Sequence, residues 1–229
     1  MMDYGSTFLA LLISYLFGSI PMGLISVKLV TGEDIRNIQS GRTGGTNAMR
    51  AAGLGVGLIT AFADISKGIL AVWFARWLSP GNVWAEVLAA TLAILGHNYS
   101  IYLVRKDEGG RLRWHGGAGG APAAGGATGF WAPSILILVP IGAAILFGIG
   151  YASLATISIP IVTAIIVAVR AWMGLGPWEY LVFCLIAEIL ILWSLRPNLK
   201  RLAAGTERVV GWRAKRQKAR REAENAAQQ

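Results

Sequence analysis

Long apolar segments alternate with short polar segments along most of this 229-residue chain. Several of the apolar segments reach the roughly 20 residues that an α-helix needs to cross a bilayer. Such a pattern is typical of a helical membrane protein in which short polar segments connect the spans. Clear spans are expected at about residues 7–30, 53–78, 84–104, 134–148, 153–169 and 178–195.

A further stretch, residues 117–131, consists mostly of glycine and alanine. One interpretation is a flexible linker, as the composition alone indicates. The other is a short, tightly packed span, because small residues let membrane helices approach one another closely. The distribution of charge along the chain distinguishes the two.

The basic residues are distributed unevenly. From Arg196 onward there are ten Lys and Arg against three Glu, so a charge of +7 lies in the tail. Basic segments tend to stay on the cytoplasmic side of a membrane, so we expect the tail there. With six spans both termini lie on the same side, and the Arg-rich segment 33–50 after the first span would then lie outside, against this tendency. Counting 117–131 as a seventh span returns that segment to the inside. We therefore predict an all-α integral membrane protein with seven transmembrane helices, an outer N-terminus and a cytoplasmic C-terminus, divided into one membrane domain over 1–205 and a basic cytoplasmic tail over 206–229.

The composition narrows the class of protein further. The chain is 55% hydrophobic and 14% charged, which is too few charges for an ordinary soluble domain. Its basic tail lacks interleaved aromatic residues, so we expect contact with anionic membrane lipid and not with nucleic acid.

Cys184 is the single cysteine, which rules out an internal disulfide. No cluster of His, Cys or carboxylate residues has the spacing of metal ligands, so we expect neither a metal nor a cofactor.

The polar segment Glu33–Arg50 is the main candidate for a binding site. It combines glycines, whose backbone can approach a ligand closely, with hydroxyl groups and arginines that bind phosphate. Thr46 or Asn47 is expected to cap a following helix, whose N-terminus would then point at the same spot. The Gly-Lys-Ser/Thr ending of a nucleotide P-loop is missing. The alternative is a solvated loop that fixes the topology through Arg36, Arg42 and Arg50.

Several helix-breaking or ionisable residues lie inside the predicted spans. Pro21 is expected to kink the first span, and in lipid such an irregularity must face protein or a watery cavity. Asp64 and Lys67 are three residues apart and share one helical face, where they either pair with each other or support a site. His97 is either a packing residue or a phosphate contact and proton donor.

Together, these segments resemble the bacterial acyl-phosphate:glycerol-3-phosphate acyltransferase family, the PlsY type. Each matching motif is weak by itself, but the motifs occur in the family's order over nearly the whole chain. The matches are Gly18–Pro21, Asp34–Arg36, Ser40–Gly41, Gly44–Asn47, Arg50, Asp64, Lys67–Gly68, Gly96–Asn98, His115–Gly117 in part, Tyr151–Leu154, Asn198–Leu202 and Gly205–Glu207.

The resemblance implies a reaction and a location. In this family an acyl group passes from acyl phosphate to the 1-hydroxyl of glycerol 3-phosphate, giving lysophosphatidate and phosphate for phospholipid biosynthesis. The resemblance places the site on the cytoplasmic face of a multi-pass protein of the inner (plasma) membrane. The resemblance also implies that no covalent enzyme intermediate is needed and that the substrate's own phosphate helps to remove the hydroxyl proton.

Carried over by position, the resemblance also implies three groups of site residues. The expected catalytic residues are Thr46, Arg50, Ser153 and Asn198. The expected phosphate-binding residues are Ser40, Gly41, Arg42, Gly44, Gly45 and Asn47. The expected supporting residues are Asp64, Lys67 and His97.

The chain departs from the family's usual pattern at three positions. Arg42 stands where the family usually has Asn, Ala118 where it usually has Lys, and Leu195 where it usually has His. The lysine is a phosphate contact, and we expect Arg42, Arg111 or Arg113 to supply the missing charge. Two alternative functions stay open: a relative that binds acyl phosphate or phospholipid without turnover, and a small transporter with a relay of Asp64, Lys67 and His97.

Overall fold

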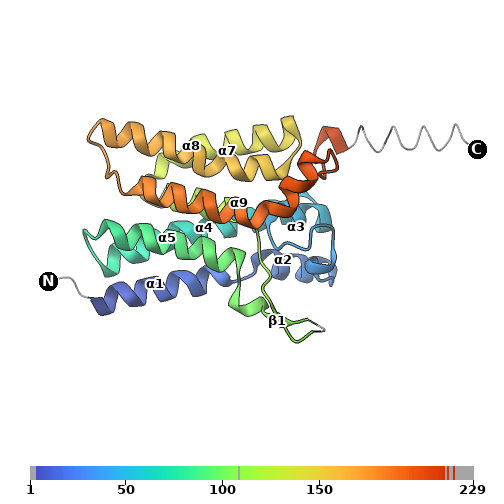
Figure 1. Ribbon diagram of the computed structural model, residues 1–229, viewed down its shortest axis with the longest axis horizontal. Helices are drawn as coiled ribbons and strands as arrows, with labels where there is room; N and C mark the ends of the chain where they lie inside the picture. Colours follow the sequence, from blue (N-terminus) through green and yellow to red (C-terminus); the bar gives the residue numbers. More distant parts are fainter. Residues whose placement is uncertain (1–3, 108, 215, 217–218, 220–229) are drawn as a thin grey trace, which may run out of the picture.

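The chain forms a bundle of helices whose long axes run in roughly the same direction (Figure 1). The computed structural model describes residues 4–107, 109–214, 216 and 219. The α-helices are α1 (Tyr4–Ser19), α2 (Met22–Thr31), α3 (Gly45–Ala52), α4 (Leu54–Leu78), α5 (Val83–Asn98), α6 (Gly120–Phe130), α7 (Ile135–Ala144), α8 (Ala152–Trp172) and α9 (Tyr180–Ala203). Between them lie the 3-10 helices η1 (Ile35–Asn37), η2 (Ile101–Leu103) and η3 (Ala132–Ser134), the π-helix η4 (Ile145–Ile149) and a hairpin of β1 (Arg105–Lys106) and β2 (Leu112–Arg113).

Much of the outer surface of the bundle is apolar. Leu29 and Trp172 are each 82% exposed, and Leu136 is 75% exposed. An apolar surface of this extent is suited to lipid and not to water. Five helical stretches in the described part of the chain are long and apolar enough to cross a membrane, namely Tyr4–Thr31, Leu54–Leu78, Ala132–Ile149, Ala152–Trp172 and Tyr180–Ala203.

Two further predicted spans are shorter in the structure than the sequence indicated. α5 ends at Asn98 and not near Val104, because the chain turns there and the Ser100 N–H bonds to the His115 carbonyl at 3.2 Å. α6 has only 11 residues, of which eight are buried. The stretch 117–131 therefore contains a tightly packed helix and is not a linker.

Glycines let α4 and α6 approach each other until their backbones are in contact. A Cβ atom on Gly68 would lie 2.2 Å from the Pro122 carbonyl oxygen, and one on Gly125 would lie 2.0 Å from the Ile65 oxygen. A larger side chain at either position would push the helices apart. This contact fixes α6 in the centre of the bundle.

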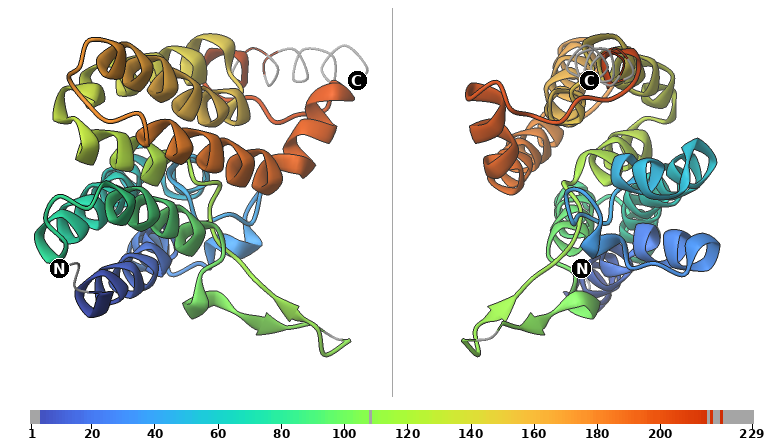
Figure 2. Two further views of the ribbon diagram at one scale, coloured as in Figure 1. Left: turned by 60° about the vertical axis from the view of Figure 1, so that its left-hand side comes forward. Right: turned by 90° about the vertical axis from the view of Figure 1, so that its right-hand side faces the viewer.

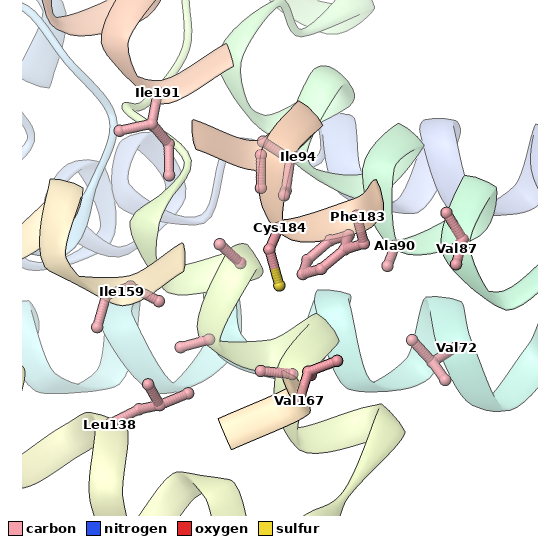
Figure 3. Close-up of a cluster of buried hydrophobic side chains, with 14 of the residues drawn as sticks. Val72, Val87, Ala90, Ile94, Leu138, Ile159, Val167, Phe183, Cys184 and Ile191 are labelled. Carbon is pink, nitrogen blue, oxygen red and sulfur yellow. The ribbon is translucent and has the colours of Figure 1, made fainter. Parts of the chain in front are cut away.

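The main hydrophobic core surrounds α6, which contributes Ala123, Ala124 and Ala127. Figure 3 shows side chains from α4, α5, α7, α8 and α9 pointing toward this central helix. Because the buried residues of α6 are mostly glycine and alanine, the surrounding helices fill the space with larger side chains. The labelled members are Val72, Val87, Ala90, Ile94, Leu138, Ile159, Val167, Phe183, Cys184 and Ile191.

The first predicted span is broken at Ile20 and Pro21, as the sequence predicted, and becomes α1 and α2. The break frees backbone carbonyls that an intact helix would use. The Ser100 hydroxyl donates to the Ser19 carbonyl at 2.5 Å, and the Lys67 ammonium donates to the Ile20 carbonyl. These two side chains provide hydrogen bonds to carbonyl groups whose burial without a partner would cost free energy.

Lys67 is held in turn by Asp64, whose Oδ1 lies 2.7 Å from the Lys67 Nζ. Both side chains are almost completely buried, at 1% and 2% exposure. His97 from α5 also lies against this carboxylate, with Nδ1 3.5 Å from the same oxygen. The two alternatives for this pair are therefore combined, because Asp64 and Lys67 bind each other and also brace the helix break.

The polar connections gather at one end of the bundle, on the right in Figure 1, and the β-hairpin projects away from the helices there (Figure 2). That end carries the loop before α3, the β-hairpin, the α7–α8 turn and the last described residues. The opposite end carries the start of α1 and the α4–α5 and α8–α9 turns, and exposed tryptophans flank these turns. Tryptophan is enriched at the boundary between membrane and water. The exposed members at this end are Trp73, Trp77, Trp84, Trp172 and Trp178.

Residues just after α9 fold back onto the polar end. Val209 pairs with Tyr151, and the Val210 N–H donates to the Gly150 carbonyl at 2.8 Å. The start of the predicted tail therefore packs on the α7–α8 turn. Most of the rest of the predicted tail, at 215, 217–218 and 220–229, lies outside the described residues.

Replacing Gly125 with valine is expected to disrupt the contact between α4 and α6, since the new side chain would overlap the Ile65 backbone. The free energy of unfolding, measured in detergent, should fall by about 3 kcal/mol. Gly55→Val is the matched control, because a Cβ atom at Gly55 on α4 meets no atom within 4 Å. Equal stability of the two variants would contradict the close approach of the two helices.

Replacing Lys67 with methionine should leave the Asp64 charge buried without its cation. Breaking a buried ion pair in this way costs roughly 3–5 kcal/mol of folding free energy. The double variant Asp64→Asn/Lys67→Met should recover part of that loss, because no uncompensated charge is left. Thermal unfolding at neutral pH measures both, and a double variant less stable than Lys67→Met would refute the buried pair.

Candidate active site

The loop between α2 and α3 is organised by the side chain of Asn47. Its amide nitrogen donates to the carbonyls of Ile38 at 3.0 Å and Arg42 at 2.9 Å, and its oxygen accepts from the Ser40 N–H at 3.4 Å. Gly41 takes a φ of +69°, which favours glycine. The prediction that Thr46 or Asn47 caps the helix is wrong. Gly44 occupies the cap position, because Asn47 is turned toward the loop.

Arg42 fastens this loop to α9, far along the chain. Its Nη1 donates to the Ser194 hydroxyl at 2.7 Å and to the Gly117 carbonyl at 3.1 Å. Its Nη2 donates to the Ser194 carbonyl and, at 3.4 Å, to Asn198 Oδ1. Burial lowers the pKa of Arg42, and nearby Arg201 lowers it further, but an arginine stays protonated at neutral pH.

The three departures from the family's usual pattern lie together in space. Ala118 and Leu195 line one polar cavity of about 160 Å³, which we call the polar pocket. Arg42 also lines it and donates to Gly117 and Ser194, the neighbours of those two residues. Arg111 and Arg113 are not among the described residues that line this pocket.

Three helix N-termini converge on the polar pocket. They belong to α3, which begins after Gly44, to α6, which begins after Gly119, and to α8, which begins after Tyr151. In the described part of the chain no side chain caps any of the three. The first N–H groups of a helix and its dipole together attract an anion. The pocket is therefore suited to a phosphate group.

Side chains add further hydrogen-bond donors to the polar pocket. Arg50 lines it and makes no ion pair with a described residue; burial, and secondarily Arg208, lowers its pKa. The Ser153 hydroxyl is buried without a hydrogen-bond partner in the described chain. The Asn198 amide donates to Glu207 Oε1 at 2.8 Å, and the carboxylate also accepts from Arg201 at 3.0 Å.

An apolar groove of about 250 Å³ adjoins the polar pocket. Side chains of α4, α7 and α8 line it, including Leu58, Leu138 and Ile159. Gly45 and Thr46 at the start of α3 line both spaces, so one ligand can extend from the polar pocket into the groove. A molecule with a charged head and an aliphatic tail matches this arrangement.

The structure brings most of the predicted site residues together. Gly41 lies instead in a neighbouring cavity, and Lys67 lies behind Asp64, which itself lines the pocket. Arg36 does not supply charge to the site, because it pairs with Asp34 at 2.9 Å, and this pair lowers the Asp34 pKa to about 2. The predicted residues that line the polar pocket are Ser40, Arg42, Gly44, Gly45, Thr46, Asn47, Arg50, Asp64, His97, Ser153 and Asn198.

Sequence reasoning missed two residues of the site. Glu207 lines the polar pocket and lies in a matching motif, but no role followed from its position in the sequence. Ser194 holds Arg42, and nothing in its local sequence distinguishes it from other serines in spans. Such long-range partners become visible only when α9 is placed against the loop.

The chain matches the family model described as glycerol-3-phosphate acyltransferase over residues 8–205. It is 39% identical to a glycerol-3-phosphate acyltransferase of Thermus thermophilus, over 89% of this chain and 95% of the relative. It is 36% identical to a glycerol-3-phosphate acyltransferase 2 of Moorella thermoacetica, over 90% of this chain and 98% of the relative.

The fold is similar to crystal structures of PlsY, described as an integral membrane glycerol 3-phosphate acyltransferase. The glycerol 3-phosphate form gives a TM-score of 0.76 at 28% identity, and the lysophosphatidic acid form gives 0.74 at 27%. Each comparison covers 90% of this chain and 96% of the other. The chain is therefore a member of the glycerol-3-phosphate acyltransferase family.

Proposed function

We propose that this membrane protein transfers an acyl group from acyl phosphate to the 1-hydroxyl of glycerol 3-phosphate, in phospholipid biosynthesis. One observation carries the proposal: three helix N-termini without side-chain caps and a partly buried arginine, Arg50, line a pocket that continues into an apolar groove. The phosphate of the donor binds at the helix N-termini and its acyl chain lies in the groove. The donor's carbonyl carbon then lies near Thr46, where the two spaces meet.

The reaction follows from that placement. The 1-hydroxyl oxygen attacks the carbonyl carbon, an ester C–O bond forms, and the C–O bond to phosphate breaks. The hydroxyl proton passes to the departing phosphate, so no side chain has to act as a base. Acyl phosphate is already activated, and the protein contributes orientation and stabilisation of negative charge.

Each predicted catalytic residue has a role in this scheme. Thr46 and the first N–H groups of α3 stabilise the charge that develops on the acyl oxygen. Arg50 binds phosphate, and Ser153 of α8 and Asn198 of α9 orient the glycerol 3-phosphate in the polar pocket.

The remaining predicted residues bind phosphate or hold the site in shape. Ser40, Gly44 and Gly45 present backbone and hydroxyl donors, while Asn47 acts through the loop that it holds. The supporting set of Asp64, Lys67 and His97 holds the floor of the pocket. This rigid cluster favours acyl transfer over a transport relay, since Lys67 is already bound to a carbonyl.

The orientation in the membrane is part of the proposal. Seven helices cross the inner membrane, with α6 as a short central one, and the polar end faces the cytoplasm. The basic loops and the start of the basic tail gather at that end, and the turns at the opposite end are flanked by exposed tryptophans. Both features fit the tendency of positive charge to stay inside. The N-terminus then lies outside.

The test is acyl transfer by the purified protein with palmitoyl phosphate and glycerol 3-phosphate. We expect phosphate and lysophosphatidate to appear in equal amounts. Thr46→Ala and Arg50→Ala should each lower kcat/KM by roughly 10²–10³-fold while the protein stays folded. Thr91→Ala and Arg111→Ala are matched controls, since neither residue lines the polar pocket.

Two outcomes would contradict the proposal. A folded protein that binds acyl phosphate without releasing either product would be a relative without turnover. Uptake of substrate into sealed vesicles without chemical conversion would indicate a transporter.

A second test concerns the charge that replaces the family's lysine. Arg42→Ala should raise the KM for acyl phosphate by roughly 10-fold or more, the effect of losing one hydrogen-bonding charge. Arg42→Lys keeps the charge and should lie between Arg42→Ala and the native chain. An unchanged KM in Arg42→Ala would mean that Arg42 only holds the loop against α9 and does not bind acyl phosphate.

A further inference from the structure

A third cavity of about 800 Å³ lies beside the polar pocket, and we call it the vestibule. Its walls come from the loop 39–42, the end of α5, the base of the β-hairpin and the last turns of α9. Among the described residues that line it there is no Asp or Glu. Six cations line it, namely Arg42, Arg113, Arg196, Lys200, Arg201 and Arg208.

Much of this positive charge is not neutralised. Arg201 pairs with Glu207 at 3.0 Å, and Arg113 pairs with Asp107 at 3.0 Å. Lys200 and Arg208 have no ion pair or hydrogen bond with any described side chain. Because like charges in one cavity repel, their arrangement is stable only when an anion is present or water screens them.

The vestibule also contains polar atoms without partners. Asn98 is 4% exposed, and neither its side-chain oxygen nor its nitrogen has a hydrogen-bond partner in the described chain. The Nδ1 atom of His115 is also buried and unpaired. Buried polar groups are nearly always hydrogen-bonded, so these atoms leave hydrogen-bonding capacity in the vestibule wall that the described chain does not use.

The vestibule and the polar pocket are neighbours. Ser40, Arg42 and Asn198 line both cavities. The Arg42 guanidinium is held to α9 at this boundary, by Ser194 at 2.7 Å. An anion in the vestibule therefore lies one side chain away from the proposed reaction site.

We propose that the vestibule is a second anion site, which binds a phosphate monoester before it reaches the polar pocket. In this proposal, glycerol 3-phosphate first binds in the vestibule and then passes Arg42 to reach the polar pocket. The identity of this substrate rests on the proposed function. The phosphate of a lipid headgroup offers the same chemistry, and the experiment distinguishes the two sources.

The test compares two variants that each remove two positive charges from the same end of the molecule. Arg113→Gln/Lys200→Gln changes the vestibule at the base of the hairpin and at the end of α9, whereas the control Lys106→Gln/Arg111→Gln changes the exposed part of the hairpin. Calorimetric titration of glycerol 3-phosphate into the full chain in neutral detergent should detect two sites in the native protein and in the control. Only one site should remain in the vestibule variant.

Steady-state kinetics provide a second readout. The vestibule variant should raise the KM for glycerol 3-phosphate about tenfold, equivalent to about 1.4 kcal/mol. Its kcat and its KM for acyl phosphate should stay within twofold (~0.4 kcal/mol) of the native values. A general loss of structure would change all three parameters.

The source of the phosphate is tested in bilayer discs of phosphatidylcholine, with and without phosphatidylglycerol. If a lipid headgroup occupies the vestibule, the anionic lipid will weaken the second binding event in the native chain. If the soluble ester is the occupant, both bilayers will give the same affinity. Either result supports a phosphate site.

A single glycerol 3-phosphate site in the native chain, or two sites in the vestibule variant, would overturn the inference. Its failure is distinct from failure of the proposed function, because binding is measured without turnover. Two binding events without products would refute acyl transfer alone.

Discussion

The break in the first helix constrains much of the remaining structure. In an apolar environment the freed carbonyls of Ser19 and Ile20 need donors, and they receive them from Ser100 and Lys67. Both donors come from other elements, so α4 and the end of α5 must lie against the break. The break in turn directs α2 toward the loop before α3, where Gly23 packs against the backbone of Thr43. The position of the candidate site thus depends on satisfying two backbone oxygens.

At the candidate site, unlike at the helix break, backbone polar groups at the helix ends receive no hydrogen bond from a side chain of the described chain. A helix start capped by Ser, Thr, Asp or Asn is typically more stable by about 1 kcal/mol than one without such a cap. Yet α3 and α6 follow glycines, and α8 follows Tyr151. Residues at the start of all three helices line the polar pocket, and no side chain of the described chain caps them. If the pocket binds an anion as proposed, local stability and function oppose each other at these three helix starts.

The sequence reveals features that local chemistry controls. Hydrophobic length located the long spans, Pro21 located the helix break, and the glycine-rich segment 40–47 located the polar pocket. Features that depend on distant partners were not predictable. Asn47 is a residue type that commonly caps helices, but its side chain bonds to the preceding loop. Arg36 is a residue type that commonly binds phosphate, but it pairs with Asp34. The bond from Arg42 to Ser194 joins segments 152 residues apart, which no local pattern encodes.

The central helix α6 has a consequence for how the protein responds to its membrane. It is surrounded by α4, α5, α7, α8 and α9, and eight of its 11 residues are buried. A helix shielded from lipid need not match the thickness of the bilayer, whereas the outer helices tilt to do so. The N-terminus of α6 forms part of the polar pocket, so the protein interior holds this part of the pocket in position. Bilayers of different thickness can then tilt the outer helices, and with them the pocket walls from α4, α8 and α9, while the N-terminus of α6 keeps its place.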